Sequence, residues 1–268
     1  MLEMKHTAQD RELFKLETST DLLNDRLKIN NNNSRINFND WLFDRLKISL
    51  GEKVLDVGCG TGSQSLKFLE KVGNKGKVCA TDISDESVNQ LIKDARSNSI
   101  LETYVGDMVQ LQKIINNFFS INQFDLVHSS YALYYANDHN KVLFSMKDSL
   151  VENGRMAVFS PHNPHGMVEF ARKFHTIPYT VDQSLIFGTE ILEPFFRKYF
   201  YEVSIHFFHN ELTLKYTEDF LTLYRATTYY NREKETEIAL AIEKEIQDYG
   251  FIIFNKPGYL IIGSDKRK

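Results

Sequence analysis

Three glycines at alternate positions, directly after a run of apolar residues, constrain this chain more than any other feature. Residues Val54 to Gly62 read Val-Leu-Asp-Val-Gly-Cys-Gly-Thr-Gly. The apolar residues predict a buried strand, and the apolar spacing of residues 63–70 predicts a helix directly after the loop. Glycine lets the backbone turn sharply and approach a ligand closely, because no Cβ stands in the way. The order of strand, glycine loop and helix therefore indicates a site for a nucleotide-type cofactor.

The glycine spacing and one acid distinguish between cofactors. A dinucleotide site of the Gly-x-Gly-x-x-Gly type places a pyrophosphate at the helix N-terminus. Here the glycines are Gly58, Gly60 and Gly62, and Asp56 stands just before the loop. A carboxylate there would repel a pyrophosphate, but it suits the ammonium of a cofactor that carries an amino acid. For the loop taken alone, a glycine turn without a ligand is the alternative.

A second acid stands where a ribose would need one. Residues 76–83 predict a strand that ends at Asp82, twenty residues after Gly62. An acid at this distance is placed to accept hydrogen bonds from ribose hydroxyls, and NAD sites share it. The alternative is a helix cap, because residues 84–87 also read as a helix start. Asp82 therefore indicates a ribose without choosing the cofactor.

With these motifs the chain resembles the class I S-adenosyl-L-methionine (SAM) dependent methyltransferases, in particular the small-molecule branch that includes quinone-biosynthesis methyltransferases. The run Asp56-Val-Gly-Cys-Gly-Thr-Gly62 matches the first motif of this family. Residues 104–108 predict a short third strand and a turn. By resemblance, Asp107 in this turn takes the adenine amino group, Met108 lies against the adenine ring, and Ser129 flanks the methionine end of SAM. The resemblance thus implies a cofactor site made of Asp56, Gly58, Gly60, Gly62, Asp82, Ile83, Asp107, Met108 and Ser129.

The segment 124–135, Phe-Asp-Leu-Val-His-Ser-Ser-Tyr-Ala-Leu-Tyr-Tyr, predicts a buried strand that breaks at Ser129 into an aromatic loop. Tyr134 and Tyr135 take the place of the usual His pair of the family. An imidazole could act as a base at neutral pH, whereas a phenol with a pKa near ~10 normally could not. We expect Tyr134, and His165 after the fifth strand, to line the methyl side as catalytic candidates. Simple packing of the loop is the alternative for the tyrosines.

Strands alternate with helical patterns over residues 54–159, which predicts a parallel α/β sheet. Ligands bind at the carboxyl ends of such strands, where the site candidates fall. The resemblance implies a Rossmann-like, seven-stranded, mostly parallel sheet of order 3-2-1-4-5-7-6. We expect a helical cap over residues 1–50, interrupted by a loop at the Asn30–Asn33 run, and a SAM-binding domain over 51–268. Insertions at about 161–198 and 215–250 would roof the acceptor site.

Composition excludes several classes of function. The chain has 32 Lys and Arg against 36 Asp and Glu, a formal net charge of −4, which argues against an extended nucleic-acid footprint. The two cysteines form neither a metal motif nor a disulfide framework, so no metal is expected. The sequence contains no signal peptide and no run of ~18 apolar residues, so we expect a cytoplasmic protein without a membrane segment. The oligomeric state stays open.

The leading hypothesis is a SAM-dependent methyltransferase that moves a methyl group to an O, N or C atom of a small, partly apolar or aromatic metabolite. Direct in-line transfer needs alignment of the acceptor and exclusion of water rather than a covalent intermediate. The aromatic share of 13%, prominent in the two insertions, is consistent with an apolar acceptor pocket. Two alternatives stay open: an RNA methyltransferase acting on a tRNA base, and a SAM-binding protein with chemistry other than methyl transfer.

Overall fold

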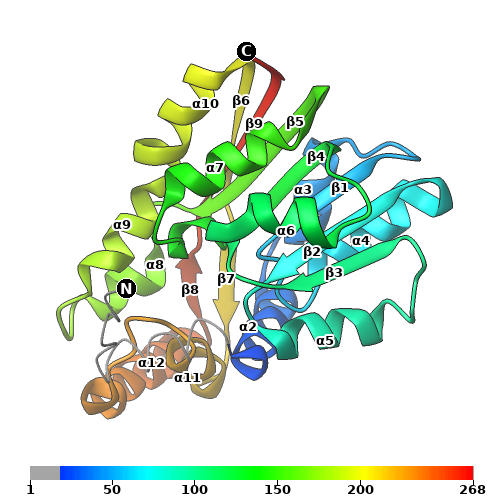
Figure 1. Cartoon of the computed structure of the whole chain (residues 1–268). Helices are drawn as coiled ribbons and strands as arrows, with labels where there is room; N and C mark the ends of the chain where they lie inside the picture. Colours follow the sequence, from blue (N-terminus) through cyan, green and yellow to red (C-terminus); the bar gives the residue numbers. More distant parts are fainter. Residues whose placement is uncertain (1–18, 268) are drawn as a thin grey trace, which may run out of the picture.

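A seven-stranded sheet runs through the centre of the computed structural model, which describes residues 19–267 (Figure 1). Its order is β3-β2-β1-β4-β5-β9-β6. The strands β1 to β5 are mutually parallel, and β9 is antiparallel to both of its neighbours, β5 and β6. Because β6 and β9 are the sixth and seventh strands of this sheet, the predicted order 3-2-1-4-5-7-6 is confirmed. The strands are β1 (Lys53–Val57), β2 (Lys77–Asp82), β3 (Leu101–Val105), β4 (Phe124–Ser130), β5 (Leu150–Pro161), β6 (Phe200–Phe208) and β9 (Gly258–Lys266).

Helices alternate with the parallel strands, as the sequence predicts. They are α4 (Ser63–Val72), α5 (Asp85–Asp94), α6 (Leu111–Phe118) and α7 (His139–Asp148), with short 3-10 turns η1 (Gly73–Lys75), η2 (Met108–Gln110) and η3 (Leu133–Tyr135). Neighbouring residues of a strand point to opposite faces of the sheet. Val54 accordingly packs in one hydrophobic cluster with Phe68 of α4, and Leu55 packs in another with Ile114 of α6. The sheet is therefore covered on both faces.

The N-terminal helices are α2 (Thr20–Asn33) and α3 (Phe38–Leu46). The predicted loop at Asn30–Asn33 is wrong, because α2 continues through this run. Asn33 donates to the Ile29 carbonyl, and Asn30 accepts a hydrogen bond from Lys256, so tertiary contacts overcome the weak helix propensity of asparagine. Residues 1–18 of the expected cap lie outside the described residues.

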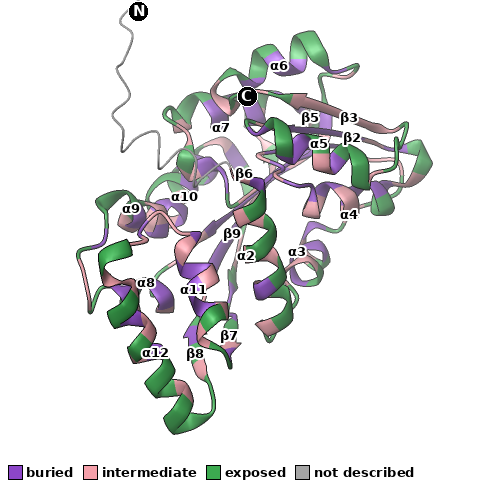
Figure 2. Ribbon diagram, turned by 90° about the horizontal axis from the view of Figure 1, so that it is seen from below, coloured by how far each residue is buried: buried purple, intermediate pink, exposed green. Residues whose placement is uncertain are grey.

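Much of the two insertions forms a second structural layer at one end of the sheet. This layer contains α8 (Gly166–Ala171), α9 (Tyr179–Phe187), α11 (Thr217–Arg225), η5 (Arg232–Lys234) and α12 (Glu235–Tyr249). The π-helical turn η4 (Gly188–Leu192) and α10 (Glu193–Tyr199) pack instead on the main sheet, where α10 contacts β6 and β9. The sequence did not predict β7 (Glu211–Leu214) and β8 (Ile252–Asn255), which pair with each other as a separate antiparallel sheet. Figure 2 shows α11, α12, β7 and β8 gathered at this end, with α2 beside α11.

This second layer has a hydrophobic core of its own. The core joins Ile29 of α2 to residues from α8, α9, α11, α12 and both short strands. Several aromatic residues of the two insertions, where an apolar acceptor pocket is expected, are part of this packing, namely Phe170, Phe174, Tyr224, Tyr229 and Tyr230. We refer to α2, α8, α9, α11, α12 and the β7–β8 sheet together as the roof.

None of the helices between residues 19 and 267 is both long enough and apolar enough to span a bilayer. In the same described part of the chain, no group of three or more His, Cys, Asp or Glu side chains is arranged to hold a metal ion.

Candidate functional site

The glycine loop joins β1 to α4 and adopts a conformation that favours glycine at each of its three alternate positions. The φ angles are +72° at Gly58, +52° at Gly60 and +88° at Gly62, values that residues with a Cβ rarely adopt. The backbone amide of Gly58 donates to the Thr81 carbonyl of β2 at 2.8 Å. The loop is therefore held against the end of the neighbouring strand.

Asp82, the last residue of β2, holds this loop in place through its side chain. One carboxylate oxygen accepts from the Gly60 amide at 2.8 Å, and the other accepts from the Ser84 amide at 2.9 Å. Burial raises the pKa of the Asp82 carboxyl above its ordinary value, although these two hydrogen bonds oppose the effect. Each oxygen keeps a second lone pair. The carboxylate can thus organise the loop and also accept from a ribose.

The surroundings of Asp82 fit the adenosine part of SAM. Ile83 and Val105, which follow β2 and end β3, are 43% and 41% exposed, so two apolar side chains are uncovered at neighbouring strand ends. Met108 lies next to the glycine loop, with its Cε 3.8 Å from where a Cβ on Gly58 would stand. The exposed Asp107 uses one oxygen to accept from the Val109 amide at 2.9 Å, which leaves the other for a donor such as an amino group.

Asp56 and Ser129 occupy the expected strand ends, but their side chains point into the protein. The Asp56 side chain is 2% exposed, and its two oxygens bond Ser65 Oγ at 2.5 Å and His128 Nδ1 at 2.8 Å. Ser129 is fully buried and donates to the Val57 carbonyl at 2.7 Å. The expected direct contact between the Asp56 carboxylate and the cofactor ammonium is therefore not supported. Both side chains instead fix β1 against β4 and α4.

His128 was not predicted as part of the site, and it links Asp56 to the ligand-facing edge. Its ring is fully buried in β4 between Asp56 and Ser130, whose Oγ lies 2.8 Å from His128 Nε2. Ser130 is only partly buried. A chain of hydrogen bonds thus runs from the interior to the end of β4. The strand pattern of the sequence indicated that His128 is buried, but not which partners it has.

Tyr134 lies in η3 and His165 precedes α8, so the two catalytic candidates come from different layers. Burial raises the pKa of Tyr134 well above its ordinary value, so this phenol stays protonated and can donate a hydrogen bond. Burial, followed by the charge of Lys256, lowers the pKa of His165 to about 3, so the imidazole is neutral at physiological pH. Its Nδ1 is buried without a hydrogen-bond partner within residues 19–267.

Two cationic residues that sequence analysis missed, Arg26 and Lys256, also face this region. Arg26 comes from α2 and Lys256 from the turn between β8 and β9. They are 230 positions apart, and neither belongs to a recognisable motif. The helical spacing of Leu23, Arg26 and Asn30 was the one available signal, since it places them on one face of a helix.

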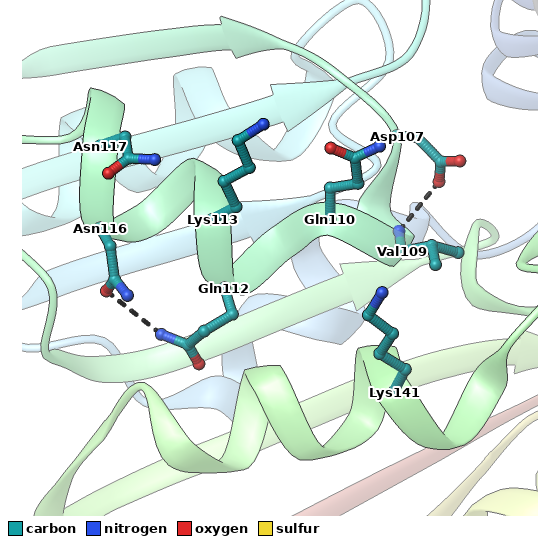
Figure 3. A pocket seen from close by; sticks show the side chains of 8 residues that line it. All are labelled: Asp107, Val109, Gln110, Gln112, Lys113, Asn116, Asn117 and Lys141. Atoms are coloured by element: carbon teal, nitrogen blue, oxygen red, sulfur yellow. Dashed lines mark hydrogen bonds between the residues drawn. The ribbon is translucent and has the colours of Figure 1, made fainter.

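A separate hollow on the outside of the sheet layer is shown in Figure 3. It has a volume of about 590 Å³ and is lined mainly by polar residues of η2 and α6, with Lys141 of α7 opposite. In Figure 3 Asp107 stands at one side of this hollow, and Gln112 bonds Asn116 at the other. The hollow includes neither the glycine loop nor residues of the roof, so we do not take it as the acceptor site.

Comparison with protein families gives one match, to the family described as "Methyltransferase domain", over residues 48–197. This span is more than half of the chain and contains the glycine loop, Asp82, Tyr134 and His165.

Curated relatives match over a shorter stretch. The ubiquinone/menaquinone biosynthesis C-methyltransferase UbiE of Vibrio campbellii is 34% identical over 133 residues, which cover 48% of this chain and 50% of that protein. The aklanonic acid methyltransferase DauC of Streptomyces sp. is 33% identical over 111 residues, which cover 41% of this chain and 49% of that protein. The chain thus spans about half the length of these relatives.

Solved structures share the fold at low sequence identity. The YcgJ protein of Bacillus subtilis has a TM-score of 0.58 at 16% identity, covering 85% of this chain and 98% of that one. The [4+2]-cyclase SpnF has a TM-score of 0.55 at 14% identity, covering 96% and 97% of the two chains. At these identities the likeness concerns the fold alone.

Proposed function

Because the chain belongs to the methyltransferase-domain family of class I SAM-dependent methyltransferases, we propose that it transfers a methyl group from SAM to a small, partly apolar or aromatic metabolite. The accepting atom is an O, N or C atom. The division into a cap over residues 1–50 and a catalytic domain over 51–268, and a cytoplasmic location, are parts of the same proposal.

The observation that carries this proposal is the hydrogen bond between Asp82 and the glycine loop. It connects Asp82, the acid placed to bind a ribose, to a loop whose three glycines have positive φ angles. Both groups lie at the carboxyl ends of adjacent parallel strands. Ligands of doubly wound sheets bind at this edge. The exposed Ile83 beside Asp82 offers an apolar surface for a base. We assign the cofactor contacts to Gly58, Gly60, Gly62, Asp82, Ile83, Asp107 and Met108.

The names of the relatives favour a small-molecule acceptor over a nucleic acid. UbiE is named for ubiquinone and menaquinone biosynthesis, and DauC for aklanonic acid. The net charge of −4 points the same way, because proteins that bind nucleic acids along an extended surface carry a basic one.

When bound, SAM would supply an electrophilic methyl group to a lone pair or carbanion of the acceptor, and S-adenosylhomocysteine would be the leaving group. The residues of this chain then have three tasks. The protonated Tyr134 donates a hydrogen bond that orients the acceptor, and the neutral His165 can donate another through its one ring N–H. The roof excludes water from the reacting atoms. The Ser130 hydroxyl at the end of β4 can pass a proton to the imidazole of His128, with which it shares a hydrogen bond. His128 is in turn hydrogen-bonded to Asp56.

The direct test combines SAM binding with turnover. We expect calorimetry to detect SAM binding, and Asp82→Asn to weaken it by about 10- to 100-fold, because a charged acceptor of hydrogen bonds is lost. Asp94→Asn, an exposed acid on α5, is the matched control and should bind normally. Incubation with SAM and a fraction of cell metabolites should yield a product heavier by one methylene group.

Unchanged SAM affinity in a folded Asp82→Asn variant would disprove the cofactor assignment. Tight SAM binding without any methylated product across the metabolite fractions would instead favour chemistry other than methyl transfer.

A further inference from the structure

The inner face of α2 connects the glycine loop to the roof. Leu23, Arg26 and Asn30 recur at helical spacing and share this face. At one end, Leu23 Cδ2 stands 2.9 Å from where a Cβ on Gly60 would lie. At the other end, Asn30 Oδ1 accepts from Lys256 Nζ at 2.7 Å. Arg26 therefore lies between the cofactor loop and Lys256.

Arg26 has no counter-charge in the described part of the chain. Its Nε is buried without a hydrogen-bond partner, and no carboxylate between residues 19 and 267 forms an ion pair with it. A buried polar group without a partner is costly, and such groups are rare in folded proteins. An unpaired guanidinium at this position therefore requires an explanation.

Lys256 adds a second unpaired cation. Its ammonium donates a hydrogen bond to the neutral side-chain amide of Asn30, and no carboxylate within residues 19–267 forms an ion pair with it. Burial, and then the charge of Arg26, lower the pKa of Lys256 to about 8. The ammonium is thus still mostly protonated at neutral pH, although its surroundings disfavour the charge.

His165 stands beside Lys256, because the start of α8 packs on the turn that carries this lysine. A Cβ on Gly166 would lie 2.8 Å from the Asn255 amide nitrogen, and the His162 amide donates to the Pro257 carbonyl at 3.1 Å. The His165 Nδ1 is buried and has no partner there. Arg26, Lys256 and His165, which come from three different segments, thus face one region between the glycine loop and the roof. None of the three is an acid.

The same region reaches the methyl side of the site. Burial raises the pKa of Tyr134, in η3 after β4, and of Tyr229, in the core of the roof, and the nearby charge of Arg26 opposes this effect at both hydroxyls. The Tyr229 ring is buried, and the Tyr134 ring is partly buried against the core of the sheet. A ligand between them would find an aromatic wall on one part of its surface and positive charge on another.

We propose that Arg26, Lys256 and His165 form a subsite for an oxyanion of the acceptor, a carboxylate or a phosphate, while Tyr134 and Tyr229 contact its aromatic or apolar body. Only an anion relieves the mutual repulsion of the two cations, and an arginine fork is suited to bind an oxyanion in bidentate fashion. A metal ion would increase the repulsion. The inference deepens the proposed function, on which it rests for the identity of the ligand as acceptor.

The test measures binding of simple oxyanions rather than turnover. Protein saturated with S-adenosylhomocysteine is titrated with benzoate and with phenyl phosphate, and benzamide is the neutral counterpart. We expect at least one oxyanion to bind and benzamide not to bind. Arg26→Met and Lys256→Met should each weaken binding by about tenfold or more, because a charge-assisted hydrogen bond is lost. Lys28→Met, an exposed lysine of α2, should bind as the wild type does.

The melting temperature of the ligand-free protein is a second readout. Arg26→Met removes a cation whose Nε is buried without a partner, so this variant should melt at or above the wild-type temperature. Lys256→Met also loses the hydrogen bond to Asn30, so it should melt slightly below the wild type. A strong loss of stability in both would mean that these cations hold the fold together, and would count against a binding role. The preference between benzoate and phenyl phosphate tells which oxyanion the subsite accepts.

The remaining outcomes separate this inference from the proposed function. No binding of either oxyanion to folded, cofactor-loaded protein would overturn the subsite and leave the methyltransferase proposal standing. An oxyanion that competes with S-adenosylhomocysteine would also overturn it, because the cluster would then serve the carboxylate of the cofactor. Oxyanion binding without any SAM binding would support the subsite and disprove the proposed function.

Discussion

Replacing Gly62 with alanine should destabilise the protein through two effects that a matched control can separate. Gly62 has a φ of +88°, and an added Cβ would lie 2.4 Å from Leu91 Cδ1 and 3.0 Å from Leu91 Cβ. Gly250, at the end of α12, has a φ of +80°, and a Cβ there would meet nothing within 4 Å. The two positions share the backbone strain, and only Gly62 adds the collision.

The expected magnitudes follow from this difference. The left-handed conformation costs an alanine about 1–2 kcal/mol, and this cost applies to both variants. Crowding a packed position costs a further ~1–3 kcal/mol. Gly62→Ala should therefore lower the free energy of unfolding by about 2–5 kcal/mol, against about 1–2 kcal/mol for Gly250→Ala. The entropy that alanine removes from the unfolded chain is the same in both and cancels.

Urea denaturation at neutral pH measures both values. Leu91→Ala, made alone and together with Gly62→Ala, closes a double-mutant cycle. The cycle should show a favourable coupling, because the smaller side chain removes the collision. If Gly62→Ala loses no more stability than Gly250→Ala, or if the cycle shows no coupling, the packing of the glycine loop against α5 is not as described.

Three further predictions concern stability. Burial lowers the pKa of Lys256 in the folded protein to about 8, against an ordinary value of 10.5. Between pH 8 and pH 10.5 the unfolded chain therefore keeps a proton on this lysine that the folded chain has released, so the free energy of unfolding increases as the pH rises. Wild-type protein should therefore gain stability relative to Lys256→Met between pH 7.5 and 10 in urea titrations, and parallel curves would contradict the burial of this ammonium. His128→Ala should cost about 3–5 kcal/mol because Asp56 is left buried without its partner, whereas Ser130→Ala should cost about 1 kcal/mol; equal losses in denaturation would argue against the buried pair. Arg155→Met should lower the melting temperature clearly, because this partly buried guanidinium bonds both oxygens of Glu52, and Arg35→Met, which breaks an exposed pair, should change it little.

The sheet could be predicted from sequence because its signals are local. Apolar runs of strand length locate β1, β2 and β4. A glycine follows the first, an acid ends the second and two serines end the third, and the family resemblance supplies their order. The short strands β7 and β8 were missed, since each has four residues and they pair across an intervening helical segment. The Asn30–Asn33 run was misread for a similar reason, because the contact that keeps Asn30 helical comes from Lys256.

The candidate site was predictable in position but not in orientation. Asp56 and Ser129 stand at strand ends, as expected, but the strand geometry turns both side chains inward. A sequence pattern locates a strand end within a residue or two, and one residue decides which face a side chain takes. Arg26 could not be found, because its significance depends on the folded surroundings, in which no carboxylate within residues 19–267 forms an ion pair with it.

The hydrogen bond between Asn30 and Lys256 has a consequence for the order in which the protein forms during synthesis. α2 leaves the ribosome early, yet its partners in α11, β7 and the Lys256 turn follow roughly two hundred residues later. The glycine loop and β1 to β5 can assemble in the meantime, because their contacts are nearer in sequence. A nascent chain would therefore gain its cofactor edge first, and the contacts of α2 with α11, β7 and Lys256 would be completed only when the C-terminal turn emerges.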